Sequence, residues 1–299
     1  LLDVNMGVPG VSEPDLMIQA VTTIQGMLPE TPLSIDSNDP DTLIAGLNHV
    51  IGRPLLNSVN GEQERMDKLL PVVRDCGANF IALAMDEDGI PEDAEARMKI
   101  IRRIVENAEE HGISRNRILV DCLVFTVGSQ PHQARETLKA VKQVREELGC
   151  CTVLGVSNVS FGLPRRAVIS SSFLAMALQA GLTAGIINPL SDRMMETLLG
   201  AELLLNRDPG AKAYVQLMKE LEEKQARLAQ SRPAKLAGTK SPGTTPQPLS
   251  SKEVGQTVTP LQESVINGDK DAVLPGIKTL LKNNISTTEI LSQHLVPAI

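Results

Sequence analysis

The stretch LSIDSNDPDTLIAGLNHVIGRPLLNSVNGE, residues 33–62, contains a complete strand–helix–strand pattern. A short apolar run at 33–36 is followed by Asp39 and Pro40, which are typical of the N-cap and the first residue of a helix. The helical pattern ends before a second apolar run at 54–59. Two short apolar strands joined through a helix predict a parallel βαβ unit.

The same alternation continues in both directions along the chain. Strands are expected at 1–5, 33–36, 54–59, 80–85, 118–123, 152–157 and 185–188. Helices are expected at 13–28, 39–50, 61–76, 91–111, 132–148, 164–181 and 191–206, and glycines that suit helix ends follow four of them, at Gly77, Gly112, Gly149 and Gly181. Seven units in series favour an α/β fold, a (β/α)8 TIM-type barrel that lacks its first strand. A doubly wound sheet is the alternative, although no GxGxxG motif follows any of the strands.

The composition changes after the last of these units and indicates three segments. Residues 1–230 are expected to form the barrel with one further charged helix. Residues 231–259 are rich in Pro, Gly, Ser and Thr and read as a flexible linker. Residues 260–299 show short helical patterns and are expected to begin a small helical cap domain. We expect the barrel to be truncated at its N-terminus and the cap at its C-terminus.

Composition and charge exclude several classes of protein. The chain of 299 residues has a formal net charge of −7 and only 2% aromatic residues, which disfavours nucleic-acid binding. No run approaches the roughly 18 apolar residues of a membrane span, and no signal peptide is evident. The four cysteines show no CxxC spacing. We therefore expect a cytoplasmic protein with reduced cysteines and no membrane or nucleic-acid partner.

Acidic and amide side chains gather where the predicted strands end. Because the active site of a (β/α)8 barrel lies at the C-terminal ends of its strands, these residues are expected to point into the barrel mouth. Turn and cap chemistry also places Asp and Asn after strands, and it explains Asn38 and Asp88 well. It explains less well the residues within or beside apolar runs, which are Asp3, Asp36, Asn57, Asp121 and Asn158. Carboxylates and amides suit a flat heterocycle with several N–H donors. Without a histidine cluster no metal site is expected, although an all-oxygen magnesium site stays open.

Five strings carry a resemblance to a known family. They are LLDVNMG (1–7), LSIDSNDP (33–40), LLNSVNGE (55–62), ILVDCLVFTVGS (118–129) and GVSNVSFGLP (155–164). In order and spacing they resemble the pterin-binding methyltransferases, which include the methyltetrahydrofolate modules of cobalamin-dependent methionine synthases; dihydropteroate synthases are more distant relatives. The segment 261–299 is similar to the helical cap that precedes a cobalamin-binding domain in methionine synthases. One departure is Cys122, where relatives often have proline.

The resemblance implies roles for particular residues. Asp3, Asp36, Asn57 and Asp121 fall on pterin-binding positions, and Gly155 and Ser157 would shape the loop that holds the pterin. Asn158 would approach N5 of the pterin and would be the catalytic residue.

The resemblance also implies an activity. A methyl group would pass from N5-methyltetrahydrofolate, the substrate, to cob(I)alamin bound by a module outside this chain, which would dock over the barrel mouth. The final acceptor in a methionine synthase would be homocysteine, held by a zinc module that this chain does not contain. The alternatives are a stand-alone methyltetrahydrofolate:corrinoid-protein methyltransferase and, less favoured, a dihydropteroate synthase or an inactive pterin-binding module.

Overall fold

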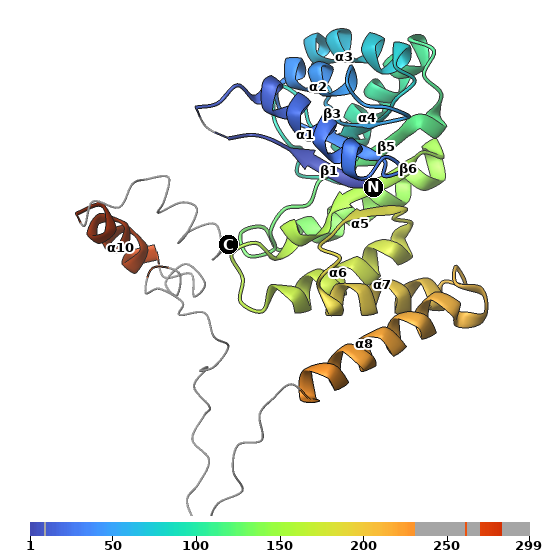
Figure 1. Ribbon diagram of the computed structural model, residues 1–299. Helices are drawn as coiled ribbons and strands as arrows, with labels where there is room; N and C mark the ends of the chain where they lie inside the picture. Colours follow the sequence, from blue (N-terminus) through green and yellow to red (C-terminus); the bar gives the residue numbers. More distant parts are fainter. Residues whose placement is uncertain (9, 231–260, 262–269, 283–299) are drawn as a thin grey trace, which may run out of the picture. The chain divides into compact units, whose positions relative to one another are not determined.

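The computed structural model describes residues 1–8, 10–230, 261 and 270–282 of the chain. The chain divides into two compact units, of which the first comprises Leu1–Phe161 with Arg165–Glu220 and the second Gly162–Pro164 with Leu221–Ile299. The first unit contains every strand of the described residues (Figure 1).

The first unit is built on one curled sheet of seven parallel strands. These are β1 (Leu2–Asn5), β2 (Leu33–Asp36), β3 (Leu55–Val59), β4 (Asn79–Leu83), β5 (Ile118–Asp121), β6 (Cys151–Gly155) and β7 (Ala184–Ile186). Each strand pairs with the next in chain order, from β1 to β7. A doubly wound sheet would reverse direction within the strand order, so this order excludes that alternative. The fold is that of a TIM-type barrel missing a strand, as the sequence predicts.

A helix follows each strand and covers the outer side of the sheet (Figure 1). The helices are α1 (Glu13–Met27), α2 (Pro40–Leu47), α3 (Gln63–Asp75), α4 (Ala94–Glu110), α5 (Gln133–Gln143), α6 (Arg166–Ala180) and α7 (Asp192–Leu204). Consecutive helices from α1 to α7 pack against each other. A longer helix, α8 (Lys212–Gln230), follows, and α10 (Lys270–Lys282) lies in the second unit. The predicted linker and, apart from Leu261 and α10, the predicted cap lie outside the described residues.

Apolar side chains on the strands alternate between two buried clusters, as the two-residue period of a strand requires. The larger cluster lies between sheet and helices and includes Leu56 and Phe80, neither of which is exposed. The smaller cluster lies on the opposite, inner face and is formed by Leu55, Ile81 and Val153. The polar residues at the strand ends continue this inner face.

Local signals set the helix ends much as expected. Asp39 caps α2, because its carboxylate accepts hydrogen bonds from the N–H groups of Asp41 and Thr42. The four predicted glycines after helices, Gly77, Gly112, Gly149 and Gly181, all have positive φ. This conformation favours glycine, which carries no Cβ.

Many predicted bounds shift by one to three residues in the structure, and two elements also run into a different kind of helical turn. The predicted strand at 152–157 ends at Gly155 and is followed by a 3-10 turn, Val156–Ser160. The predicted helix at 132–148 is α-helical only to Gln143 and finishes as a π-helical turn, Val144–Leu148. The 3-10 turn has i→i+3 hydrogen bonds and the π-helical turn has i→i+5 hydrogen bonds. The spacing of apolar side chains over so few residues does not distinguish them from the end of a strand or of an α-helix.

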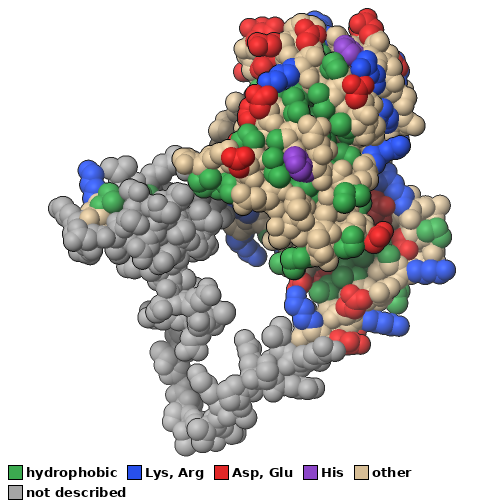
Figure 2. All heavy atoms as spheres, turned by 45° about the horizontal axis from the view of Figure 1, so that its top comes forward, with side chains coloured by type: hydrophobic (Ala, Val, Ile, Leu, Met, Phe, Trp, Pro, Cys, Tyr) green, Lys and Arg blue, Asp and Glu red, His purple; other side chains and the backbone are tan. Residues whose placement is uncertain are grey.

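Acidic and basic side chains are interspersed over the face shown in Figure 2 rather than gathered by sign. Several form surface ion pairs, such as Lys68 with Asp41 at 2.8 Å. Among the described residues, the structure has no helix with the length and hydrophobicity that crossing a membrane requires.

Candidate active site

Four of the predicted site residues lie on strands, at the C-terminal end of the strand or two residues before it. Asp36 and Asp121 are the last residues of β2 and β5, and Asn57 lies in the middle of β3. Asp36 pairs in register with Asn5 on one side and with Asn57 on the other. Asp3 lies on the same face of β1 as Asn5, two residues earlier. The parallel sheet therefore gathers these side chains along one inner edge.

Asp36 is the centre of a small polar cluster. The Asn5 Nδ2 group donates a hydrogen bond to Asp36 Oδ2 at 3.0 Å. Burial raises the pKa of Asp36, the Asn5 hydrogen bond opposes this rise, and the neighbouring carboxylates of Asp3 and Glu13 add to it. Asp3 itself is exposed. A half-buried carboxylate next to a second one is suited to accept N–H donors from a ligand, which would relieve the repulsion.

The side chain of Asn57 makes no hydrogen bond within the described part of the chain, although hydrogen bonds hold the backbone around it in place. Its amide makes no hydrogen bond with any residue that the structure describes, while its backbone carbonyl accepts the Ser37 N–H at 3.1 Å. The peptide bond that follows, Asn57–Ser58, is cis. Arg65 on α3 donates to the carbonyls of Ser37, Asn38 and Ser58. The loops after β2 and β3 are thereby held together, without use of the Asn57 amide.

Asp121 is half-buried and accepts one strong hydrogen bond. Its Oδ1 accepts the backbone N–H of Leu123 at 2.7 Å. Burial raises the pKa of Asp121 to about 6, against the lowering effects of this hydrogen bond and of the nearby Arg97 charge. Its other carboxylate oxygen accepts no hydrogen bond from the described residues. At neutral pH Asp121 is therefore mostly ionised and keeps one free acceptor. The adjacent Cys122 is buried, and burial raises the pKa of its thiol well above the usual range.

Asn158 lies in the turn after β6, not on the strand itself. The side-chain amide packs over Gly155, since a Cβ built at Gly155 would lie 3.0 Å from Asn158 Nδ2. The Asn158 carbonyl accepts the Phe161 N–H at 3.2 Å, whereas its exposed amide has no hydrogen-bond partner in the described part of the chain. The side chain is thus held by contact with the Gly155 backbone and keeps its hydrogen-bonding groups open.

The backbone of this turn is tied to its neighbours. The Ser157 carbonyl accepts hydrogen bonds from Ser160 Oγ at 3.1 Å and from Arg166 at 3.2 Å. The Val127 N–H donates to the Val159 carbonyl at 3.0 Å, which joins the loop after β5 to the turn after β6. Ser157 therefore acts through its backbone, and the loops that carry Asp121 and Asn158 form one connected structure.

The structure thus brings Asp3 into contact range of Asp36, and Asn158 onto Gly155. It places Asn57 beside Asp36 in the sheet, and Asp121 farther along the same end. The seven predicted site residues accordingly form three local groups at one end of the sheet.

Arg97 is a residue that the sequence reasoning missed. It lies on α4 and is fully buried behind the loop that follows Asp121. The sequence contains an indication of its burial, because Arg97 falls on the apolar face of α4 with Met98, Ile101 and Ile104. A cation on such a face indicates an internal polar network.

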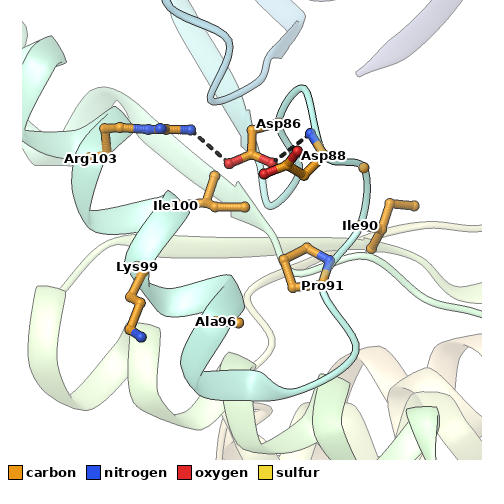
Figure 3. A pocket seen from close by; sticks show the side chains of 9 residues that line it. Asp86, Asp88, Ile90, Pro91, Ala96, Lys99, Ile100 and Arg103 are labelled. Carbon is orange, nitrogen blue, oxygen red and sulfur yellow. Dashed lines mark hydrogen bonds and ion pairs between the residues drawn. The ribbon is translucent and has the colours of Figure 1, made fainter.

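A cavity of about 370 Å³ lies beside the β4–α4 loop (Figure 3). An ion pair between Arg103 and Asp86 at 2.9 Å forms part of its wall, and Asp86 also accepts the Asp88 N–H. None of the seven predicted site residues lines this cavity; its walls are formed by Asp86, Asp88, Gly89, Ile90, Pro91, Ala96, Lys99, Ile100 and Arg103. Across residues 1–8, 10–230, 261 and 270–282, no group of three His, Cys, Asp or Glu side chains could hold a metal ion.

Comparison with known proteins gives consistent results. The family described as "Pterin binding enzyme" matches residues 3–188. The chain is 32% identical over 188 residues to a methylcorrinoid:tetrahydrofolate methyltransferase of Eubacterium limosum, which covers 62% of this chain and 69% of the relative. It is 31% identical over 196 residues to the methionine synthase of Mycobacterium leprae, which covers 61% of this chain and 16% of the synthase.

Solved structures support the fold. A dihydropteroate synthase of Xanthomonas albilineans in complex with 7,8-dihydropteroate superposes with a TM-score of 0.53 at 18% identity, over 68% of this chain and 79% of that one. A Yersinia pestis DHPS with a pterine–sulfa conjugate gives a TM-score of 0.56 at 16% identity, over 69% of this chain and 83% of that one.

Proposed function

The chain belongs to the pterin binding enzyme family, and we propose that it binds 5-methyltetrahydrofolate and transfers the methyl group on N5 to cob(I)alamin, as one module of a methionine synthase. The names of two relatives at 32% and 31% identity, a methylcorrinoid:tetrahydrofolate methyltransferase and a methionine synthase, support this reaction class. The chain spans 16% of the methionine synthase that it matches, so the activity of a whole synthase is part of the proposal.

The observation that carries the proposal is that the side-chain amide of Asn158 has no hydrogen-bond partner among the described residues. Its exposed amide rests on Gly155 and bonds to no residue that the structure describes. An asparagine that served only the turn would use this amide on nearby backbone groups. A free amide at the open end of the sheet is able to donate to a ligand atom.

The chemistry of the methyl donor gives this amide a role. A methyl group on a tertiary amine is a poor electrophile, because the departing nitrogen would carry negative charge. A hydrogen bond to N5 that strengthens as this charge develops lowers the barrier without equally strengthening substrate binding. Asn158 supplies such a donor and needs no pKa near 7.

The carboxylates would hold the rest of the pterin. Its ring N–H and amino groups are donors, which match the free oxygen of Asp121 and the half-buried carboxylate of Asp36. The Asn57 amide offers both a donor and an acceptor. Three such contacts from different strands would fix the orientation of a flat ring, and with it the position of N5.

The methyl acceptor would arrive on another domain that docks over the barrel mouth. We favour a tethered module over a stand-alone methyltransferase, because the sequence of 231–299 resembles a linker and the start of a cobalamin cap. Homocysteine and its zinc site would belong to a further module.

The test replaces Asn158 with alanine in the full chain. Two quantities are measured on the same protein: equilibrium binding of 5-methyltetrahydrofolate and single-turnover methyl transfer to free cob(I)alamin. We expect the Asn158→Ala rate to fall roughly 10²-fold or more, with less than about a tenfold loss of affinity.

Asn48→Ala is the matched control. Asn48 is an exposed asparagine at the C-terminal end of α2, on the side of the sheet opposite the site. Its replacement should leave both quantities unchanged. A wild-type chain that does not bind the folate would contradict the proposed function, and an Asn158→Ala variant that transfers at the wild-type rate when saturated would contradict the role of Asn158.

A further inference from the structure

The guanidinium group of Arg97 lies buried between three segments at the C-terminal end of the sheet. Its side chain is not exposed at all. It donates hydrogen bonds to the loop before α4, to the loop directly after β5 and to α5, and the acceptors are Pro91 O, Cys122 O, Leu123 O, Thr137 Oγ1 and Gln133 Oε1. The Phe125 ring lies 5.7 Å from the guanidinium carbon. One side chain therefore connects the β4–α4 loop, the β5–α5 loop and α5.

Every one of these acceptors is neutral, so no carboxylate directly neutralises the buried cation. The charged or titratable groups that face Arg97 are Cys122, Glu136, Asp121 and Asp93. Glu136 is itself engaged with Lys139 and with the Ala94 N–H. Of the predicted site residues, Asp121 is the one that feels the charge of Arg97.

The backbone next to Asp121 is held in an unusual conformation. Leu123 has φ 61°, in the left-handed region, which costs a non-glycine residue about 1–2 kcal/mol. In this conformation its N–H reaches Asp121 Oδ1, while its carbonyl accepts hydrogen bonds from Arg97 at 3.2 Å and from Thr137 Oγ1 at 2.8 Å. The contacts on the carbonyl hold the peptide in the orientation that the N–H needs.

We infer that Arg97 is a positioning residue, which acts through the Cys122–Leu123 backbone to keep Asp121 ionised and oriented as the acceptor for pterin N–H groups. This inference rests on the proposed pterin site. Without Arg97, the Leu123 carbonyl loses one of its two side-chain partners and Asp121 loses the positive charge behind it. Burial already raises the pKa of Asp121, and removing the cation would raise it further.

The direct test compares Arg97→Met with the wild-type chain. Methionine keeps much of the side-chain volume and removes the charge and the hydrogen bonds. The affinity for 5-methyltetrahydrofolate is measured from pH 5 to 9, and the Asp121 carboxyl is titrated in the ligand-free protein by carbon NMR. We expect the wild-type midpoint near pH 6 to rise to about 7 or above, and the affinity at pH 7.5 to fall about tenfold.

Arg117→Met is the matched control. Arg117 is partly buried, whereas Arg97 is fully buried, and it likewise donates to backbone carbonyls, those of Val73 and Ala78, at the opposite end of β5. Its loss should lower the melting temperature without moving the pH midpoint. Asp121→Asn provides the second reference, because any pH dependence that remains in this variant comes from the ligand or from other groups.

The outcomes separate the two claims. A wild-type midpoint retained in Arg97→Met, with folate affinity unchanged, overturns the inference and leaves the proposed function standing. A raised Asp121 midpoint in the NMR titration supports the action of Arg97 on Asp121 even if the folate does not bind, and a failure to bind would contradict the proposed function. If Arg97→Met does not fold, Thr137→Val is used, since it removes one partner of the Leu123 carbonyl. The same titration should then show a smaller rise, and an unchanged midpoint would overturn the inference.

Discussion

Replacing Asp121 with asparagine should stabilise the fold at neutral pH and at the same time weaken pterin binding. Asparagine has nearly the same shape, and its oxygen can still accept the Leu123 N–H that Asp121 Oδ1 accepts at 2.7 Å. What changes is the charge, which burial disfavours. The substitution therefore removes an unfavourable ionisation and also removes the anion that a pterin would bind.

The magnitude follows from the pKa of Asp121. Burial raises this pKa to about 6, while an unfolded aspartate titrates near 4. A difference of about two pH values corresponds to at most about 3 kcal/mol at pH 7.5. Because the side chain is only half-buried and the asparagine amide also needs a partner, we expect a gain of about 1–2 kcal/mol.

The pH dependence has a definite sign. The folded chain holds the Asp121 proton more tightly than the unfolded chain, so the wild-type penalty is absent below about pH 4. It grows as the pH rises through 4 to 6 and stays constant above that range. Asp121→Asn should therefore match the wild type at pH 4 and exceed it at pH 7.5.

Denaturant unfolding at pH 4, 5, 6 and 7.5 measures this difference, together with folate affinity at pH 7.5. Asp39→Asn is the control of opposite sign, because hydrogen bonds from Thr42 lower the pKa of the Asp39 cap. Its loss should destabilise the chain at pH 7.5, and the difference should shrink at low pH. An Asp121→Asn variant that is less stable than wild type at pH 7.5, or whose advantage does not depend on pH, would refute the reasoning.

Two further predictions follow from the same end of the sheet. Gly155→Ala should displace the Asn158 amide, because the new Cβ would lie 3.0 Å from Nδ2. Methyl transfer should slow at least several-fold while the melting temperature changes little. An unchanged rate would contradict the packing of Asn158 over Gly155. Cys122 should resist alkylation in the folded chain, because it is buried and burial raises the pKa of its thiol, whereas the exposed Cys76 should react. Mass spectrometry after iodoacetamide treatment distinguishes the two cysteines. Modification of both at the same rate would contradict the burial of Cys122.

Some elements were predictable because their causes are local. The strand at 33–36 was predicted with the bounds that the structure has, and Asp39 caps α2 as expected. An N-cap, a proline after it and a glycine after a helix act over a few residues, so the chain reveals them without its fold. The turn at 156–160 was not predicted, since its hydrogen bonds, including that from Val127 to Val159, depend on a neighbouring loop.

In the candidate site, too, local features could be predicted and contacts between distant segments could not. The sequence alone placed Asn57 within a strand and Asp36 and Asp121 within or beside strands, because apolar runs mark the strands and the polar residues interrupt them or follow them. It could not show that Asp36 bonds to Asn5, 31 residues away, or that Arg97 reaches the carbonyls after Asp121. Strand register and helix packing decide which distant groups meet, and these arise only when the whole sheet closes on its helices. The identity of the acidic and amide residues is therefore a property of the sequence, whereas their charge state and hydrogen-bond partners are decided by the tertiary structure, since burial and contacts with distant segments determine both.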